Sequence, residues 1–514
     1  MNSQCKIALI GAGSVGVSFL AQLIQHLHDY EGSKVNCHIT VFEPAEKIGY
    51  GTAYQEDLNT NLLNIPAGNM SLYDKHRSHF LEWIALLPKS TLQFYGVNEI
   101  DAAAFYPRPL FGRYVQEQFE NIITQSATLG ICINLVKAAI INIQKQPNET
   151  LLLSDTKNQI HEFNKVVLCN GNLTSDKFES LNQYNGYLHT PYPVSALTKK
   201  IHPESTVGIL GSNLSAIDII AALKAQGHTG NIHCFSRQGI LPAVRSIHSC
   251  SWENRPSKAD IHALAQAKNG RLSLQDVFDF LHKKTSALDP QFDLQDAIGS
   301  GKDAAQRLDD ELKVALNQTR PWQAVLSGMN EVVDLVWKYL TPADKEKFHT
   351  RWRSLWMSRR GMFPVKNALT LSKMLKSKQL YIHGGFKQCE PNTEKAGFIM
   401  QCHNESGNTE TTSCDFVINA TGFSQHVNHS RDPLVLNLLA SGLADSSEYG
   451  GFKLDFDTGA LITRRGDIET AVTVLGSLAC GTYFWTVSMD VNARLANEQA
   501  SRMAEGLCKT IEMA

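Results

Sequence analysis

The chain has 514 residues, which is long enough for two or three domains with hydrophobic cores. Its 48 Lys and Arg residues nearly balance its 50 Asp and Glu residues, so the charge favours neither nucleic acid nor a membrane surface as a partner. No apolar run is long enough to span a bilayer, and the first predicted strand leaves no room for a signal peptide, so a cytoplasmic location is expected.

The first predicted unit is strand, turn, helix and strand. An apolar run at Cys5–Ile10 leads into Gly11-Ala12-Gly13-Ser14-Val15-Gly16, then a helical run to Leu27 and a second β-rich run that ends at Glu43. The first glycine of such a turn permits the tight bend, the second lets a pyrophosphate approach, and the third lets the helix pack on the strand. The phosphates would lie on the free N–H groups of the helix, and Glu43 would accept hydrogen bonds from ribose. The unit therefore predicts a dinucleotide site formed by Gly11, Gly13, Ser14, Val15, Gly16 and Glu43.

Two irregular segments follow Glu43. Glycines in the segment 44–54 indicate a loop whose backbone passes close to a flat or charged group, with Gly49, Gly51 and Thr52 as contacts. The segment Leu62–Ser71 is apolar but is interrupted by Asn, Pro and Gly, so no regular element is expected there. It can run past the ring end of a cofactor, through Asn64, Pro66 and Ala67, or it can be a surface connection. The spacing leaves both open.

Helical patterns at His79–Leu87 and Phe111–Gln125 come next. Arg108 and Arg113 lie at the start of the second pattern, where they can contact phosphates or pair with surface acids, and the latter is the commoner fate of an arginine. Strand-like runs then occur at 131–135, 139–144, 151–153 and 166–171, the last ending in a turn of small residues.

A second dinucleotide signal begins with the short strand Val207–Leu210. The turn reads Gly211-Ser212-Asn213-Leu214-Ser215-Ala216, so asparagine stands at the second glycine position, and a helix and another strand follow. This unit ends in Ser236 and Arg237 rather than in an acid. These two can bind a ribose 2′-phosphate, which an acid would repel, and they favour NADP over NAD. The alternative is a plain packing turn.

Residues 257–348 are helical and mixed in charge, which predicts a helical insertion covering one side of the second domain. Trp352–Gly361 is basic and aromatic. It can face a cofactor phosphate or an acidic substrate, but a solvated helix face is the safer interpretation. Strands resume at 379–383, 398–402, 415–420 and 471–475, and a helix follows at 490–509. This return predicts that the second domain is inserted in the first, with boundaries at 1–198, 199–364 and 365–514.

The chain offers no clear metal site. Its 11 cysteines are dispersed and none forms a Cys-x-x-Cys pair, which argues against a zinc site and a disulfide-type flavin reductase. His76 with His79, and His426 with His429, have spacings that a metal can use. Neither pair has further ligands nearby, so ordinary polar histidines are expected.

The motifs together resemble those of the bacterial FAD-NAD(P)-binding proteins, a family allied to class B flavin monooxygenases. The matching segments are Gly11–Gly16, Phe42–Pro44, Gly49–Tyr54, Asn64–Gly68, His79–Trp83, Pro107–Arg108, Phe111–Tyr114, Gly211–Asp218, Ser236–Gly239, Asn419–Phe423 and Asp432–Leu434. The resemblance spans essentially the whole chain. It is specific for fold and cofactors and not for substrate.

The resemblance implies an α/β fold with two dinucleotide-binding Rossmann-like domains. FAD would bind the N-terminal unit and NADPH the unit at Gly211, with Asn64–Gly68 beside the flavin ring. Arg113, Thr421, Gly422, Gly476 and Gly481 are the further residues expected at FAD. On the NADPH side they are Gly211, Ser212, Asn213, Leu214, Ser215, Ser236 and Arg237. Asn213 departs from the family, which usually has glycine there.

The function that this resemblance implies is an NADPH-dependent flavin monooxygenase. NADPH would reduce FAD, and O₂ would form a hydroperoxyflavin that gives one oxygen to a small amine, purine or similar nucleophile. No acid–base pair is needed, and the sequence predicts no catalytic side chain. Two alternatives stay open: a reductase that passes electrons to a quinone or protein, and a flavin-holding redox sensor without turnover.

Overall fold

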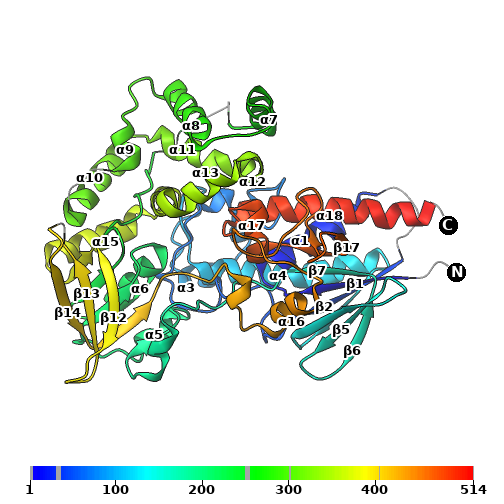
Figure 1. Ribbon diagram of the computed structural model, residues 1–514, viewed down its shortest axis with the longest axis horizontal. Helices are drawn as coiled ribbons and strands as arrows, with labels where there is room; N and C mark the ends of the chain where they lie inside the picture. The colour runs from blue at the N-terminus through cyan, green and yellow to red at the C-terminus, as the bar shows by residue number, and fades with distance from the viewer. Residues whose placement is uncertain are drawn as a thin grey trace.

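The computed structural model describes residues 4–30, 36–248, 250, 255–299, 303–404 and 406–512. Figure 1 shows a sheet with its helices at the right, the antiparallel strands of residues 386–414 at the left, and a layer of helices above. Both termini lie at the right, beside the first sheet. This is the predicted α/β class with two Rossmann-like halves.

The first sheet has the order β16-β17-β7-β1-β2-β3, and every neighbouring pair except β16–β17 is parallel. Its central strands β1, β2 and β7 are apolar runs buried on both faces, as in other parallel sheets, whereas the edge strand β3 is largely exposed. The strands of this sheet are β1 (Cys5–Ile10), β2 (Cys37–Phe42), β3 (Cys132–Val136), β7 (Lys165–Leu168), β16 (Ala460–Ile462) and β17 (Ile468–Val474).

Helices from both ends of the chain cover this sheet. α1 (Ser14–His28) packs against α4 (Arg108–Thr128) and along α18 (Met489–Glu512). Gln22 Nε2 donates to the carbonyl of Ala493 at 3.0 Å, so the last helix is fixed to the first. The remaining helices of this half are short: α2 (His79–Ala85), α3 (Lys89–Phe94), α16 (Pro433–Ser441) and α17 (Cys480–Tyr483).

The second sheet is parallel throughout, in the order β11-β10-β9-β15-β8. The helices that accompany it are α5 (Val194–Thr198), α6 (Leu214–Ala225) and α15 (Val365–Lys376). Its strands are β8 (Tyr187–Leu188), β9 (Val207–Leu210), β10 (Ile232–Phe235), β11 (Leu380–His383) and β15 (Phe416–Asn419).

The strand pairing differs from the predicted boundaries at residues 198 and 364. β8 precedes residue 199, and β11 and β15 follow residue 364, yet all three pair in the second sheet. The reason is that both halves repeat one plan. A three-stranded antiparallel sheet, β4–β6 or β12–β14, separates the outer strand from the strand that returns beside the first. β15 therefore pairs with β9 as β7 pairs with β1.

The two antiparallel sheets are formed from consecutive strands. The first contains β4 (Ile140–Lys145), β5 (Leu151–Asp155) and β6 (Ile160–Phe163), and the second contains β12 (Phe386–Pro391), β13 (Phe398–His403) and β14 (Thr409–Cys414).

The helical layer lies between β10 and α15. It contacts both halves, because Trp337 Nε1 donates to the carbonyl of Gly481 while α10 packs against α15. A π-helical turn at Phe348–Trp352 leads into α14 (Arg353–Arg360). The layer comprises α7 (Lys258–Ala267), α8 (Leu274–Leu288), α9 (Leu294–Ile298), α10 (Ala304–Asn317), α11 (Pro321–Gly328), α12 (Val333–Tyr339) and α13 (Pro342–Lys347).

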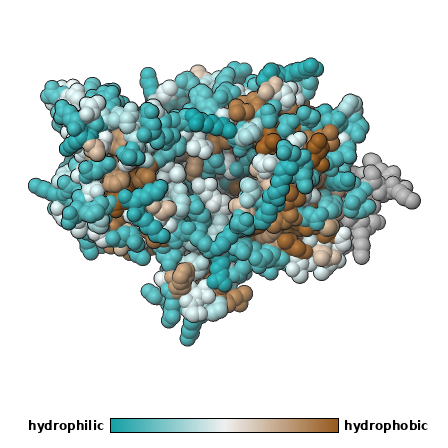
Figure 2. Space-filling model, turned by 90° about the horizontal axis from the view of Figure 1, so that it is seen from below, coloured by the Kyte–Doolittle hydropathy of each residue, from teal (hydrophilic) through white to brown (hydrophobic). Residues whose placement is uncertain are grey.

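The surface seen in Figure 2 is largely hydrophilic, with apolar side chains gathered mainly on the half that carries the first sheet. Within the described ranges, no helix is both long and apolar enough to cross a bilayer. The same ranges contain no group of three or more His, Cys, Asp or Glu side chains that can hold a metal ion.

A buried ion pair joins the two dinucleotide units. Arg108, at the start of α4, places Nη2 2.9 Å from Oδ2 of Asp218 in α6. The Tyr192 hydroxyl donates to the same carboxylate at 2.8 Å, and Arg108 Nε donates to the carbonyl of Leu62. Arg108 thus pairs with an acid, but with the buried Asp218 and not with an acid at the surface.

Replacing Arg108 with methionine leaves the Asp218 carboxylate buried without its cation. We expect the free energy of unfolding to fall by about 3–5 kcal/mol, as for other broken buried pairs. Arg113→Met on the same helix is the matched control, because Arg113 pairs with Glu117 at the surface and should cost at most about 1 kcal/mol. Urea unfolding followed by circular dichroism measures both, and equal losses would contradict a role for the pair between the units.

Candidate functional site

A cavity of about 730 Å³ lies at the carboxyl ends of strands from both sheets. Gly11, Gly13 and Glu43 line it from the first unit, while Ser215 and Gly422 line it from the second. In open parallel sheets this end of the strands is where cofactors bind. The volume is in the range of small-molecule and cofactor sites, which is about 300–1,000 Å³.

Glycine stands at the three positions of the first turn for different reasons. A Cβ on Gly11, where φ is +93°, would lie 2.3 Å from the carbonyl oxygen of Cys169, and one on Gly16 would lie 2.2 Å from that of Gly11. Packing within the protein therefore requires both. Gly13 has extended backbone, and its Cβ would meet nothing nearer than the Cα of Gly51 at 3.8 Å. The bare face between Gly13 and Gly51 is space that the protein leaves open.

Polar groups around this open face fit the adenosine diphosphate part of FAD. No side chain caps the N–H groups of the first turn of α1, which begins at Ser14 and Val15. The Glu43 carboxylate is held at the end of β2 by the N–H groups of Ala12 (2.9 Å) and Ala45 (3.0 Å). Asn170 also lines the cavity, and its buried Oδ1 has no partner in the part of the chain that the structure describes.

Other predicted FAD residues gather around the same turn. Gly49 forms a bridge with Gly13, and Thr52 lines the cavity. Gly476 faces the side chain of Val15, since a Cβ there would lie 3.7 Å from it. Thr421 donates to Asn419 Oδ1, which orders the turn before Gly422.

Several predicted residues do not line this cavity. Arg113 pairs with Glu117 at 2.8 Å on α4. Gly481 is explained by packing, because a Cβ would lie 2.2 Å from the carbonyl oxygen of Gly450. Asn64, Pro66 and Ala67 also lie outside its walls: Ala67 is fully buried, and the carbonyl of Asn64 accepts from Arg245 at 3.3 Å.

The second unit presents another helix start to the cavity. Gly211 has a φ of +123°, and a Cβ there would lie 2.6 Å from the carbonyl oxygen of Ala420. Asn213 has nearly the backbone of Gly13, with ψ −164° against −174°, and its exposed side chain makes no cap. Ser215 follows in the first turn of α6 and lines the cavity, so an uncapped helix start reaches it from each unit.

The remaining residues expected at NADPH surround that turn. Ser212 is buried and donates to the carbonyl of Ile240, and Leu214 begins α6. The Ser236 hydroxyl accepts from the N–H of Gly239 at 2.9 Å. Arg237 is exposed, and its Nη2 donates to Ser354 Oγ at 3.0 Å, so among the described residues no acid forms an ion pair with it.

Sequence patterns did not single out part of the cavity wall. These residues follow β7 or lie before α5: Asn170, Gly171, Asn172, Thr174, Ser175, His189, Thr190, Pro191 and Tyr192. The feature of the sequence that could have identified some of these residues is the turn of small residues at the end of the predicted strand 166–171. The carboxyl end of that strand lies beside the first glycine turn because β7 pairs with β1.

Two buried thiols, one of them in the cavity wall, have raised pKa values. Burial raises the pKa of Cys169, which lines the cavity, well above its usual range, and raises that of Cys480 to about 11. Thiol–disulfide exchange needs a thiolate, so these two cysteines are poorly suited to it.

Residues 8–173 match the model of the FAD-NAD(P)-binding family. The match spans β1 through β7, which is the half that carries Gly13 and Glu43. It confirms the resemblance drawn from the motifs and the predicted cofactor class, FAD with a nicotinamide dinucleotide. A comparison with curated proteins finds no match.

Solved structures with a similar fold cover nearly the whole chain. Ornithine hydroxylase from Pseudomonas aeruginosa is 11% identical, with a TM-score of 0.58 over 99% of this chain and 100% of its own. L-Lysine 6-monooxygenase from Pseudomonas syringae is 13% identical, with a TM-score of 0.56 over 99% and 100%. Kutzneria sp. 744 ornithine N-hydroxylase, in a structure with reduced FAD, NADP⁺ and L-ornithine, is 11% identical with a TM-score of 0.55 over 98% and 99%. At these identities the likeness shows a shared fold.

Gly13→Val tests whether the open face is the cofactor site. The side chain has room within the protein, so we expect a native far-UV circular dichroism spectrum but at least about ten-fold weaker FAD binding, because the pyrophosphate would lose its approach. Gly16→Val is the contrasting variant: its Cβ meets backbone at 2.2 Å, so it should fail to fold. Full flavin occupancy in purified Gly13→Val would refute the assignment.

Proposed function

We propose that the protein is an FAD-dependent, NADPH-using monooxygenase that hydroxylates a small nucleophilic substrate of the amine or purine type. The observation that carries this proposal is the single cavity that both dinucleotide units enter, with Gly13 on one wall and Ser215 on another. A cofactor on each uncapped helix start would bring its redox-active ring toward the other.

Bound FAD would accept a hydride from NADPH and use O₂ to oxidise the substrate. For an amine the balance is R–NH₂ + O₂ + NADPH + H⁺ giving R–NHOH + H₂O + NADP⁺. The chain's own residues bind and orient the cofactors and keep water out. α1 and Glu43 would hold the FAD diphosphate and ribose, while α6, Ser236 and Arg237 would hold the nucleotide.

The comparisons support this reaction class. The structural neighbours with the same fold include N-hydroxylating enzymes that act on ornithine and lysine. The protonated thiol of Cys169 favours direct oxidation over a thiol relay. Electron transfer to a quinone or protein, and redox sensing without turnover, are the competing outcomes of the tests below.

Arg237→Ala tests the nucleotide preference. Arg237 forms no ion pair with an acid within the described ranges, so its guanidinium is available to a 2′-phosphate. A charge-assisted hydrogen bond contributes about 1.5–3 kcal/mol, so the variant should bind NADPH about ten- to a hundred-fold more weakly. The affinity for NADH should change little. Dissociation constants from flavin-reduction kinetics measure both, and equal losses would assign Arg237 a structural role.

Oxygen accounting tests the reaction itself. Amines and purines are screened for stimulated NADPH oxidation under ¹⁸O₂, and an active substrate should gain one labelled oxygen for about each NADPH consumed. Peroxide that matches NADPH across the screen, with no labelled product, would replace the monooxygenase by a reductase. Flavin that NADPH does not reduce would favour a sensor.

A further inference from the structure

Two arginines without an acidic partner lie where the helical layer meets both halves. Arg245 belongs to a segment that runs beside Phe363. Val244 forms a β-bridge with Phe363, and the N–H of Arg245 donates to the carbonyl of Phe363 at 3.0 Å. Arg360 ends α14, three residues before Phe363. The side chains of Arg245 and Arg360 therefore start from adjacent stretches of backbone.

The contacts of both side chains are few. Arg245 Nη2 donates to the carbonyl of Asn64 at 3.3 Å, and its guanidinium lies 6.0 Å from the ring of Phe105. Arg360 Nη2 donates to Asn330 Oδ1 at 2.5 Å, and its guanidinium lies 5.6 Å from the ring of Trp485. The Nε of each is buried without a partner among the described residues.

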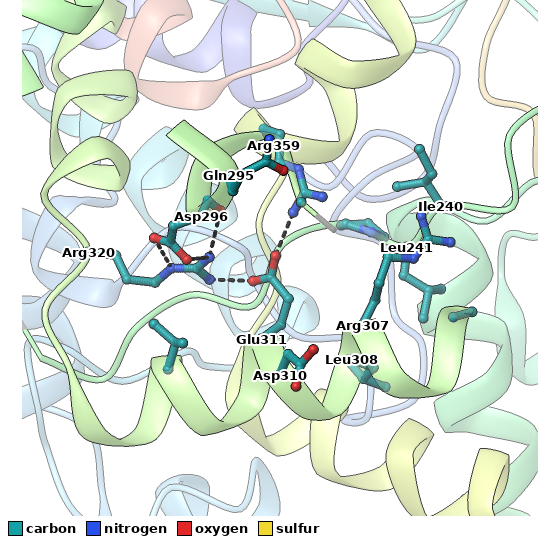
Figure 3. Close-up of a pocket in the computed structure, with 14 residues that line it drawn as sticks. Ile240, Leu241, Gln295, Asp296, Arg307, Leu308, Asp310, Glu311, Arg320 and Arg359 are labelled. Carbon is teal, nitrogen blue, oxygen red and sulfur yellow. Dashed lines mark hydrogen bonds and ion pairs between the residues drawn. The ribbon is translucent and has the colours of Figure 1, made fainter. Parts of the chain in front are cut away.

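Three other arginines that are buried, Arg320, Arg359 and Arg494, are paired with acids. Figure 3 shows Arg320 between Asp296 and Glu311, and Arg359 directed at Glu311 across a pocket of about 150 Å³. Arg494 pairs with Asp334 at 2.8 Å. In the described parts of the chain, neither Arg245 nor Arg360 forms an ion pair with an acid.

Asp490 does not neutralise the two arginines. Its charge acts on both, and the positive charge of Arg360 helps to lower the pKa of its carboxyl. Its oxygens, however, are bonded to Ser488, Asn330 and the N–H of Val491. Two cations with one carboxylate leave an excess of one positive charge. Burial, with the neighbouring Arg360, lowers the pKa of Arg245 to about 10, so this guanidinium stays charged near neutral pH. Burial also lowers the pKa of Arg360.

The arginine pair adjoins both cofactor regions. Asn64, the partner of Arg245, belongs to the segment expected beside the flavin ring. A Cβ on Gly361, next to Arg360, would lie 3.6 Å from the side chain of Leu214 at the start of α6. Arg245 is partly accessible while Arg360 is buried, so the side of the pair nearer solvent is that of Arg245.

Strained backbone marks the same junction. Phe484, which precedes Trp485, has a φ of +62° and a ψ of −66°. Its ring packs 4.7 Å from that of Trp337 and 5.3 Å from that of Phe348, the first residue of the π-helical turn. Both features are rare, and such strain is concentrated at functional sites.

We propose that Arg245 and Arg360 together bind the carboxylate of the substrate, which is therefore a small organic acid that also carries the oxidisable nucleophile. Two guanidinium groups with free N–H donors suit a carboxylate, and an anion there neutralises the excess charge. That the anion is a substrate rests on the proposed monooxygenase function. The proposal that this pair binds an acid does not depend on that function.

Thermal unfolding separates a ligand site from a structural charge pair. Arg245→Met removes an unpaired buried cation, so we expect the melting temperature of the purified flavoprotein to stay the same or rise. Arg494→Met is the matched control: it strands Asp334 and should lower the melting temperature clearly. A drop for Arg245→Met as large as for Arg494→Met would overturn the proposal.

Ligand binding tests the chemistry directly. The standard α-amino acids and L-ornithine, each with its α-carboxamide, are titrated into the flavoprotein while the flavin spectrum is followed. At least one acid should bind about ten- to a hundred-fold more tightly than its amide. Arg245→Gln and Arg360→Gln should abolish this difference, and Arg360→Lys should restore part of it. An acid preference absent from the wild type, or unchanged in both glutamine variants, would overturn the proposal.

The same variants distinguish the substrate from the cofactors as the source of the anion. We expect the affinity for the acid to fall by a larger factor than the affinity for NADPH. A larger loss for NADPH would assign the pair to the nucleotide and overturn the proposal. If wild-type protein discriminates acid from amide but NADPH does not reduce its flavin, the proposed function fails while the acid site stands.

Discussion

The buried contact between Arg108 and Asp218 fixes how the two dinucleotide units face each other. Asp218 lies one turn after Ser215 on α6, and Tyr192, which donates to Asp218, lines the cavity. Arg108 also holds the carbonyl of Leu62, at the start of the segment that leads to Asn64. The Arg108 guanidinium thus links the start of α4, the first turn of α6 and the segment at Leu62. The distance between the two uncapped helix starts follows from this cluster, and any cofactor geometry in the cavity depends on it.

The local parts of the fold were predictable from the sequence. The units at Gly11 and Gly211 were recognised because strand, glycine turn and helix are adjacent in the chain, and each pattern is satisfied within about 30 residues. The pairing of β11 and β15 in the second sheet, although both follow residue 364, was not indicated by the sequence, because a short apolar strand such as β15, 416–419, fits either sheet. Its partner β9 lies some 200 residues earlier, and no local pattern encodes that choice.

Glycines show the same limit within the site. Gly13 and Gly481 both occur in expected motifs, but a sequence does not tell a glycine kept for packing from one kept for a ligand. The structure separates them, since a Cβ on Gly481 would meet backbone at 2.2 Å whereas one on Gly13 would meet open space.

The sequence also did not tell buried arginines from exposed ones. The stretch 352–361 was interpreted as a solvated helix face, which is wrong for Arg359 and Arg360, only 6% and 7% exposed. Arg245 lies in an irregular segment without periodicity, so nothing in its surroundings marked it.

An unpaired buried cation is costly, so the arginine pair is retained at the expense of stability. Arg359 and Arg360 are neighbours on α14, yet Glu311 neutralises the first while no acid in the described chain pairs with the second. At its junction with the first half the helical layer supplies Asp334 to Arg494 of α18, but no acid of the described chain forms an ion pair with Arg360. An anion bound there would contact Arg360 on α14, Arg245 on the segment after β10, and through it the Asn64 loop. It would tie the layer to both halves.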